Sequence, residues 1–191
     1  MTKLTSPVTK LNLGAGFKKI DGYTNVDYDA NCNPDIVCNL ESETWPFDDN
    51  SITDVVAHHI LEHLGEGYFH FMQELHRVCK DGAIIDVVVP HHRHDVFAND
   101  PTHKRPITID GLKMFSKSFN QYCIDIQDGT SKLGMFYNVD FDILDFTFVF
   151  DSAYKHLLNN MTPEKEKQIQ KLSRECNNVI IETHLKLQVI K

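Results

Sequence analysis

The sequence predicts an α/β protein, a three-layer sandwich with a mostly parallel β-sheet at its centre. Short apolar runs rich in β-branched residues recur through the first half of the chain. Between Gly67 and Asp81 the apolar residues have the three-to-four spacing of a helix with one buried face. The run Ala83–Val89 that follows is nearly continuous in apolar residues, as is typical of a buried parallel strand. Strands interleaved with helices favour this layered architecture.

Four strands are expected before the first long helix, over Leu11–Leu13, Tyr23–Asp27, Asp35–Leu40 and Ile52–Ala57. The helix is expected to bury one apolar face, made by Tyr68, Phe71, Met72, Leu75, Val78 and Cys79. Gly82 is the predicted left-handed cap of that helix. Ala83–Val89 should then lie near the centre of the sheet, covered on both faces and ended by Pro90.

The second half begins with a polar, histidine-rich loop over Pro90–Pro106, long enough to suggest a function. Helix starts are predicted at Thr108, with Ile109, Leu112 and Phe115 buried, and at Thr162–Pro163, with Ile169 and Leu172 buried. Strands are predicted over Phe141–Phe150 and Val179–Ile190. The last one alternates apolar and polar residues, which favours an antiparallel strand.

Length and composition limit the class of protein. The 191 residues fit one domain, 1–191, and the net charge of −8 opposes general binding to nucleic acid. We find no apolar stretch long enough to span a membrane, and Met1–Lys10 has no signal core. The five scattered cysteines have no Cys-x-x-Cys spacing, which argues against disulfides and a zinc knuckle. A cytoplasmic protein is therefore expected.

A glycine turn follows the first predicted strand, in Asn12-Leu13-Gly14-Ala15-Gly16. Ligands of open α/β sheets bind beyond the carboxyl ends of the strands, where glycine lets the backbone approach them closely. Asp27 ends the second strand, and a carboxylate there can accept hydrogen bonds from both ribose hydroxyls. The third glycine of the dinucleotide fingerprint is missing, and only ten residues separate Gly16 from Asp27. A nucleoside without a diphosphate is the favoured ligand.

Several ordered segments together resemble a known family. The run LNLGAG, NVD, DIVCNL, WPFDDNSITDVVAHHILEHL and ELHRVCKDGAIIDVVVP is similar to the core of class I S-adenosylmethionine (SAM) dependent methyltransferases, in particular to compact bacterial and phage members of the type 11 group. The resemblance covers Lys10–Arg105, with a looser match in the last strand. It implies a Rossmann-like seven-stranded sheet with an antiparallel last strand. It further implies a SAM-binding half near 10–90 and an acceptor-side half near 91–191.

The resemblance also implies roles for individual residues. Gly14, Ala15 and Gly16, with Asn12 where an acid is common, would meet the methionine part of SAM. Asp27 matches the ribose-binding acid, and Tyr28 would lie along the adenine. Asn39, followed by Leu40, occupies the position that faces the adenine amino group, and His58 would line the site near the methionine. SAM carries a sulfonium cation and no phosphate, so carboxylates, amides and carbonyls suit it.

The chain has eleven histidines, and most of them fall in two segments, His58–His63 and His91–His103. His59, Glu62 and His63 are interpreted as structural residues that open a helix after the fourth strand and hydrogen-bond locally. Their order differs from the His-Glu-x-x-His of zinc hydrolases, which argues against such an enzyme. His91 is the predicted base that removes a proton from the methyl acceptor, with His103 as the second candidate. His103 paired with Asp100 could instead stiffen the loop, and Lys104 and Arg105 could meet an acidic substrate group or solvent. The preferred expectation includes no metal; a divalent ion held by His91, His92, His94 or Asp95 is the alternative.

The leading hypothesis is a SAM-dependent methyltransferase acting on a hydroxyl or amine of a small molecule, with sugars and glycan precursors consistent with the subgroup. A non-catalytic SAM-binding domain is the second hypothesis, because Asn12 and Asn39 are milder than the usual acids. A nucleotide-dependent oxidoreductase is the third and weakest. The chain has no Asn-Pro-Pro-Tyr motif for flipped bases. A homodimer and a monomer remain equally open.

Overall fold

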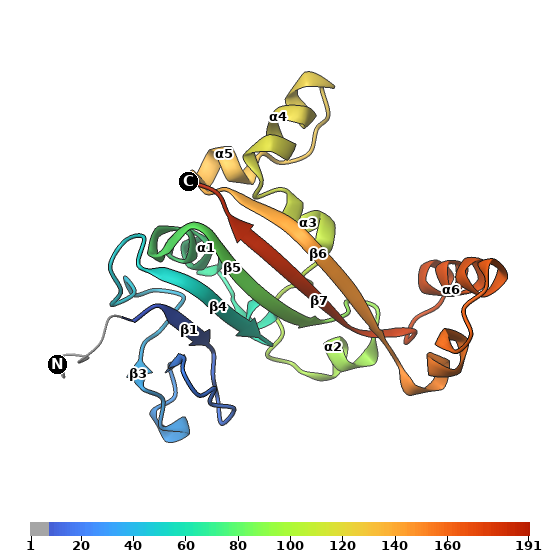
Figure 1. Ribbon diagram of the computed structural model, residues 1–191, viewed down its shortest axis with the longest axis horizontal. Coiled ribbons are helices and arrows are strands. Elements are labelled where there is room, and N and C mark those ends of the chain that lie inside the picture. Colours follow the sequence, from blue (N-terminus) through green and yellow to red (C-terminus); the bar gives the residue numbers. More distant parts are fainter. Residues whose placement is uncertain (1–7) are drawn as a thin grey trace.

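The computed structural model describes residues 8–191, so most of the segment Met1–Lys10, expected to have no signal core, lies outside the described part. Its centre is a seven-stranded sheet in the order β3-β2-β1-β4-β5-β7-β6 (Figure 1). The strands are β1 (Lys10–Leu13), β2 (Thr24–Asp27), β3 (Ile36–Val37), β4 (Ile52–His58), β5 (Cys79–Pro90), β6 (Phe141–Phe150) and β7 (Ile180–Val189). The predicted seven-stranded α/β sheet is confirmed.

The first five strands are parallel to one another, whereas β7 is antiparallel to both β5 and β6. The predicted antiparallel last strand is thus confirmed. Parallel pairing brings the carboxyl ends of β1, β2 and β4 to one edge of the sheet, where ligands of such sheets bind.

The helices are concentrated in the second half of the chain. They are α1 (Tyr68–Val78), α2 (Asp95–Asn99), α3 (Ile109–Lys113), α4 (Lys117–Asp125), α5 (Leu133–Tyr137) and α6 (Pro163–Glu175), with short 3-10 turns η1 (Ala30–Cys32), η2 (Leu61–His63) and η3 (Ser152–Leu158). Thr108 and Thr162 cap α3 and α6, as the sequence predicts. The predicted loop Pro90–Pro106 contains α2, a helix too short to leave a periodic signal. No described helix is long and apolar enough to cross a membrane.

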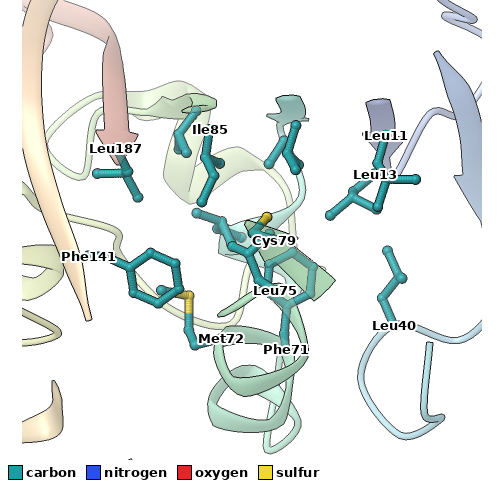
Figure 2. Close-up of a cluster of buried hydrophobic side chains, with 14 of the residues drawn as sticks. Leu11, Leu13, Leu40, Phe71, Met72, Leu75, Cys79, Ile85, Phe141 and Leu187 are labelled. Atoms are coloured by element: carbon teal, nitrogen blue, oxygen red, sulfur yellow. The ribbon is translucent and has the colours of Figure 1, made fainter. Parts of the chain in front are cut away.

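One face of the sheet forms the hydrophobic core with α1. Figure 2 shows Phe71 and Leu75 of α1 beneath Leu11, Ile85 and Leu187 of three different strands. All five side chains are buried, which is the packing that the helical spacing predicts. Further along the sheet, α3 contacts β6 and adds Leu112 to the same cluster.

The opposite face of the sheet carries several polar, partly exposed side chains. The register places Asp54, Asp86 and Lys186 on this face, beside Lys10 and His184. The side chains of Asp54, Asp86, Lys10 and His184 are each about two-fifths exposed. The expectation that Ala83–Val89 is covered on both faces is therefore wrong, since Asp86 in its middle points to water.

Two further sequence expectations need correction. Gly82 has a positive φ of 76°, but it lies inside β5, where the pairing with β4 shifts register, and Cys79 caps α1. Glycine thus allows an irregularity in the strand rather than a helix cap. The predicted strand Asp35–Leu40 shortens to the two residues of β3, because the chain then turns into the wall of the pocket described next.

Candidate active site

A pocket of about 530 Å³ opens where β1, β2 and β4 end. Its lining comes from the turn after β1, the end of β2, the segment after β3, the turn after β4 and the loop after α2. The lining residues are Gly14, Asp27, Tyr28, Cys38, Asn39, Leu40, Glu41, His59, Ile60, His63, Leu64, Thr102 and Lys104. Five predicted cofactor residues therefore line one pocket, namely Gly14, Asp27, Tyr28, Asn39 and Leu40.

The glycine turn forms one corner of the pocket. Gly14 has φ of +65°, and a Cβ built there would lie 2.7 Å from the Cδ1 atom of Ile60. Glycine is therefore required at this position for two reasons, the backbone conformation and the close approach of Ile60. The buried Ala15 donates its backbone N–H to the carbonyl oxygen of Val26 (3.1 Å), which fixes the turn to β2.

Asp27 connects the glycine turn to the end of β2. One carboxylate oxygen accepts the N–H of Gly16 at 2.8 Å, and the other accepts the N–H of Asp29 at 2.9 Å. An ionised carboxylate offers about four acceptor positions, so both oxygens can accept further hydrogen bonds from a ligand. Tyr28 follows at the mouth of the pocket, with 77% of its surface exposed. Together they form a carboxylate beside an open aromatic ring.

The segment after β3 forms the next wall. Leu40 is buried and gives this wall an apolar surface. The side-chain oxygen of Asn39 accepts the N–H of Glu41 at 3.0 Å, so the oxygen keeps one lone pair and the amide keeps both N–H groups. A carboxylate oxygen of Glu41 accepts a hydrogen bond from the backbone N–H of Gly65 at 2.9 Å. This wall therefore offers the apolar side chain of Leu40 next to the amide of Asn39.

Four predicted cofactor residues do not line the pocket: Ala15 and Gly16, which continue the glycine turn, and Asn12 and His58. Asn12 is buried and donates from its amide to the carbonyl of Lys18 (3.0 Å) and the side-chain oxygen of Asn25 (2.9 Å). It therefore holds the turn against β2 and does not line the pocket. His58 lies on the open face of the sheet, 3.5 Å from Asp86. Its neighbour His59 takes the pocket position.

A histidine wall, which we define as His59 and His63, closes the side after β4. His59 has a positive φ of 53°, a strained conformation for a residue that is not glycine. Its Nδ1 lies 3.3 Å from Glu62 and its Nε2 lies 3.4 Å from Glu182. The close carboxylate of Glu62 raises the pKa of His59. The sequence interpretation of these histidines as structural missed their place in the pocket; their position directly after a strand was the available signal.

The loop after α2 lies against the histidine wall. Lys104 donates its backbone N–H to the carbonyl of Glu62 at 2.7 Å, and Thr102 contacts Nδ1 of His63 at 2.9 Å. Arg105 donates to the carbonyl oxygens of Leu64 and Gly65. Its guanidinium also lies over the ring of Tyr68. These contacts hold the loop so that Thr102 and Lys104 line the pocket.

The two predicted bases have different surroundings. Burial, together with nearby His92 and Arg93, lowers the pKa of His91 to about 4, and the residue does not line the pocket. Nδ1 of His91 accepts the N–H of Arg93 at 3.3 Å. His103 lies between two pocket-lining residues, with its ring 4.7 Å from that of His63. Of the two predicted bases, His103 is therefore the one that lies beside the pocket.

An ion pair supports the wall formed after β3. Glu74 of α1 is nearly buried and accepts the N–H of Trp45 at 2.7 Å, while Arg77 bonds it at 2.7 and 2.8 Å. The indole of Trp45 in turn donates to the carbonyl of Leu40. Burial alone would raise the pKa of Glu74, but the hydrogen bonds from Arg77 and Trp45 lower it.

We expect Glu74→Gln to lower the free energy of unfolding by about 2–3 kcal/mol at pH 7, because it leaves Arg77 without its buried partner. Since the folded pKa of Glu74 is lowered, the ion pair stabilises above the unfolded pKa of about 4.3. The stabilisation is lost as the pH falls through the folded pKa. Urea denaturation of both proteins at pH 7 and about pH 3.5 tests this, with the exposed Glu66→Gln as control. Equal stabilities of Glu74→Gln and the unchanged protein at pH 7 would contradict it.

Comparisons with known proteins support the fold that carries this pocket. Residues 8–86 match the model of a methyltransferase domain. No curated protein matches the chain. Among solved structures, a SAM-dependent methyltransferase from Archaeoglobus fulgidus is 17% identical, with 95% of this chain and 86% of that chain covered and a TM-score of 0.61. One from Methanosarcina mazei is 15% identical, with 97% and 94% covered and a TM-score of 0.54.

A third similar structure catalyses a different reaction. The [4+2]-cyclase SpnF is 16% identical, with 96% of this chain and 75% of that chain covered and a TM-score of 0.55. At these identities the likeness establishes a shared fold. Because one fold supports several chemistries, activity must be argued from the pocket.

Proposed function

We propose that this chain, which has the fold of class I SAM-dependent methyltransferases, binds SAM in the pocket and transfers its methyl group to a small molecule. One observation carries the proposal. The glycine corner at Gly14 and the carboxylate of Asp27 share one pocket with the histidine wall. The first two features suit an adenosine ribose, and the third lies where an acceptor could approach.

The charges of the pocket fit a sulfonium nucleoside. Asp27 and Glu41 supply carboxylates to the lining, against one cation, Lys104. A diphosphate would need a helix N-terminus after the glycine turn, whereas β1 and β2 are joined without a helix in the described chain. This difference favours SAM over a dinucleotide and weakens the oxidoreductase hypothesis.

Different residues of the pocket would position different parts of SAM. SAM, when bound, supplies an electrophilic methyl group on a positively charged sulfur. Asp27 would accept the ribose hydroxyls, Asn39 and Leu40 would hold the adenine, and Gly14 would admit the methionine part. Transfer requires the acceptor, the methyl group and the sulfur in line, and the histidine wall with His103 provides the nearby groups that handle the acceptor proton.

We propose that the methyl acceptor is a hydroxyl or amine of a small molecule, with sugars and glycan precursors as the first class to test. The net charge of −8 supports this choice over nucleic acid.

A non-catalytic SAM-binding domain is the second candidate. It is favoured by Asn12, whose amide already donates to Lys18 and Asn25. Without an acid at that position the methionine part would be held less firmly, so its methyl group would be placed less accurately.

Calorimetry should detect saturable binding of SAM and S-adenosylhomocysteine with one site per chain, and no saturable binding of NAD. Incubation with SAM carrying a labelled methyl group and a panel of sugars, amines and cell extract then separates the candidates. A labelled product supports the enzyme, and binding without any product supports the second candidate. Absence of binding of both SAM and its product at millimolar concentration would contradict both.

A further inference from the structure

Glu62 is a buried carboxylate without a hydrogen bond. Its residue is 0% exposed, and within the described chain neither carboxylate oxygen has a hydrogen-bond partner. His59, 3.3 Å from one oxygen, is its ion-pair neighbour. Burying a carboxylate costs several kcal/mol unless it is paired and hydrogen-bonded. Glu62 lies directly beside the pocket and its oxygens accept no hydrogen bond, so it is a candidate ligand for a cation in addition to its contact with His59.

His63 and His103 converge on the same carboxylate. One ligand atom from each of Glu62, His63 and His103 lies within 4.8 Å of the other two. The three come from two segments, η2 and the loop after α2, which the bond from Lys104 N–H to the Glu62 carbonyl joins at 2.7 Å. The cluster is therefore held together by backbone contacts as well as by its side chains.

The protonation of His103 follows from its contact with Phe97. Its Nδ1 lies 2.7 Å from that carbonyl oxygen, which can only accept, so Nδ1 carries a proton. In the neutral ring Nε2, which lies 3.8 Å from a carboxylate oxygen of Asp100, then holds a lone pair.

A relay of hydrogen bonds fixes His63 in the same state. The hydroxyl of Thr102 lies 2.6 Å from a carboxylate oxygen of Asp100, so it donates its proton there. Its oxygen must therefore accept the 2.9 Å bond from Nδ1 of His63, which leaves Nε2 of His63 free. Histidines that bind metals commonly donate their other N–H to a carbonyl or a hydrogen-bonded acceptor in this way.

We propose that Glu62, His63 and His103 bind a divalent transition-metal ion, with zinc as the preferred ion. Two imidazoles and one carboxylate form a typical set of three protein ligands that leaves a position for water or substrate. Ligand bonds of roughly 2.0–2.2 Å require the three side chains to move closer together on binding. The sequence interpretation assigned Glu62 and His63 structural roles and put its alternative metal site at His91–Asp95.

His63 also lines the pocket, so the ion would lie in its wall. Resting on the proposed function, the open position would take an oxygen of the acceptor and lower its pKa. With the ion bound, His63 and His103 would act as its ligands and not as bases for the acceptor proton. That role agrees with the absence of a strongly basic histidine at His91, whose pKa is about 4.

The test is a titration of the chelator-treated, untagged full chain with zinc chloride by calorimetry, without SAM. Cobalt(II) in place of zinc reports coordination through its visible absorption. We expect one ion per chain, and binding weakened by more than about 100-fold in His63→Ala and in His103→Ala. His156→Ala, which removes an exposed histidine of η3, should bind as the unchanged protein does.

Glu62→Gln keeps the test valid if a histidine variant fails to fold. It removes a buried charge, so the metal-free variant should melt no lower than the metal-free unchanged protein, yet lose the rise in melting temperature that zinc produces. No binding by the unchanged protein, or equal binding by all four variants, would overturn the proposal. Since this titration omits SAM and the nucleoside titration omits zinc, either proposal can fail alone.

Discussion

Replacing Asp27 by alanine is expected to weaken SAM binding by at least about 100-fold. Two hydrogen bonds from ribose hydroxyls to a carboxylate are each worth roughly 1.5–3 kcal/mol, and each 1.4 kcal/mol corresponds to a tenfold change. The substitution also removes the acceptors of the Gly16 and Asp29 N–H groups, so the glycine turn becomes less fixed. Calorimetry with S-adenosylhomocysteine measures the dissociation constant directly.

Two further variants separate these contributions. Asp27→Asn keeps the shape and one acceptor oxygen, so its loss should be smaller than that of the alanine variant. Asp21→Ala removes an exposed acid from the same connection between β1 and β2 and should leave the dissociation constant unchanged. If Asp27→Ala bound the nucleoside as tightly as the unchanged protein, the ribose assignment would be wrong.

Gly14→Ala is the second substitution with a large expected effect, on stability as well as binding. A residue with a Cβ at φ of +65° costs about 1–2 kcal/mol, and the clash with Ile60 at 2.7 Å adds about 1–3 kcal/mol of overpacking. Ile60 itself lines the pocket, so its displacement also changes the binding site. Urea denaturation should give a loss of about 2–5 kcal/mol.

Gly16→Ala is the matched control for the clash. Gly16 has a similar φ of +50°, but a Cβ there would meet no atom within 4 Å. It should therefore lose only the backbone contribution, about 1–2 kcal/mol. Adding Ile60→Val to Gly14→Ala should recover part of the difference between the two glycine variants. Equal losses for Gly14→Ala and Gly16→Ala would show that the approach of Ile60 contributes nothing.

The strands and the glycine corner were predictable because their signals are local. The order of β1, the glycine turn and β2 lies within a few residues, and Asp27 ends its strand where the chain must turn. The antiparallel β7 was equally readable from its alternation. These features depend on the neighbouring residues in the chain and little on the rest of the fold.

The arrangement of the histidines could not be predicted in the same way. His58 and His59 are adjacent, and a positive φ at His59 decides which of them lines the pocket. The cluster of Glu62 with His103 depends on a loop forty residues further on, folded back by backbone hydrogen bonds that no side-chain pattern records. Asp86 likewise stands in an apolar run, and only the open sheet face explains its polarity.

The most direct test of the account is a structure of the chain with S-adenosylhomocysteine. We predict the ribose on Asp27, the adenine between Tyr28 and Leu40, and the sulfur facing His59 and His63. A nucleoside bound outside the pocket after β1, β2 and β4, or one with its sulfur turned away from the histidine wall, would contradict it.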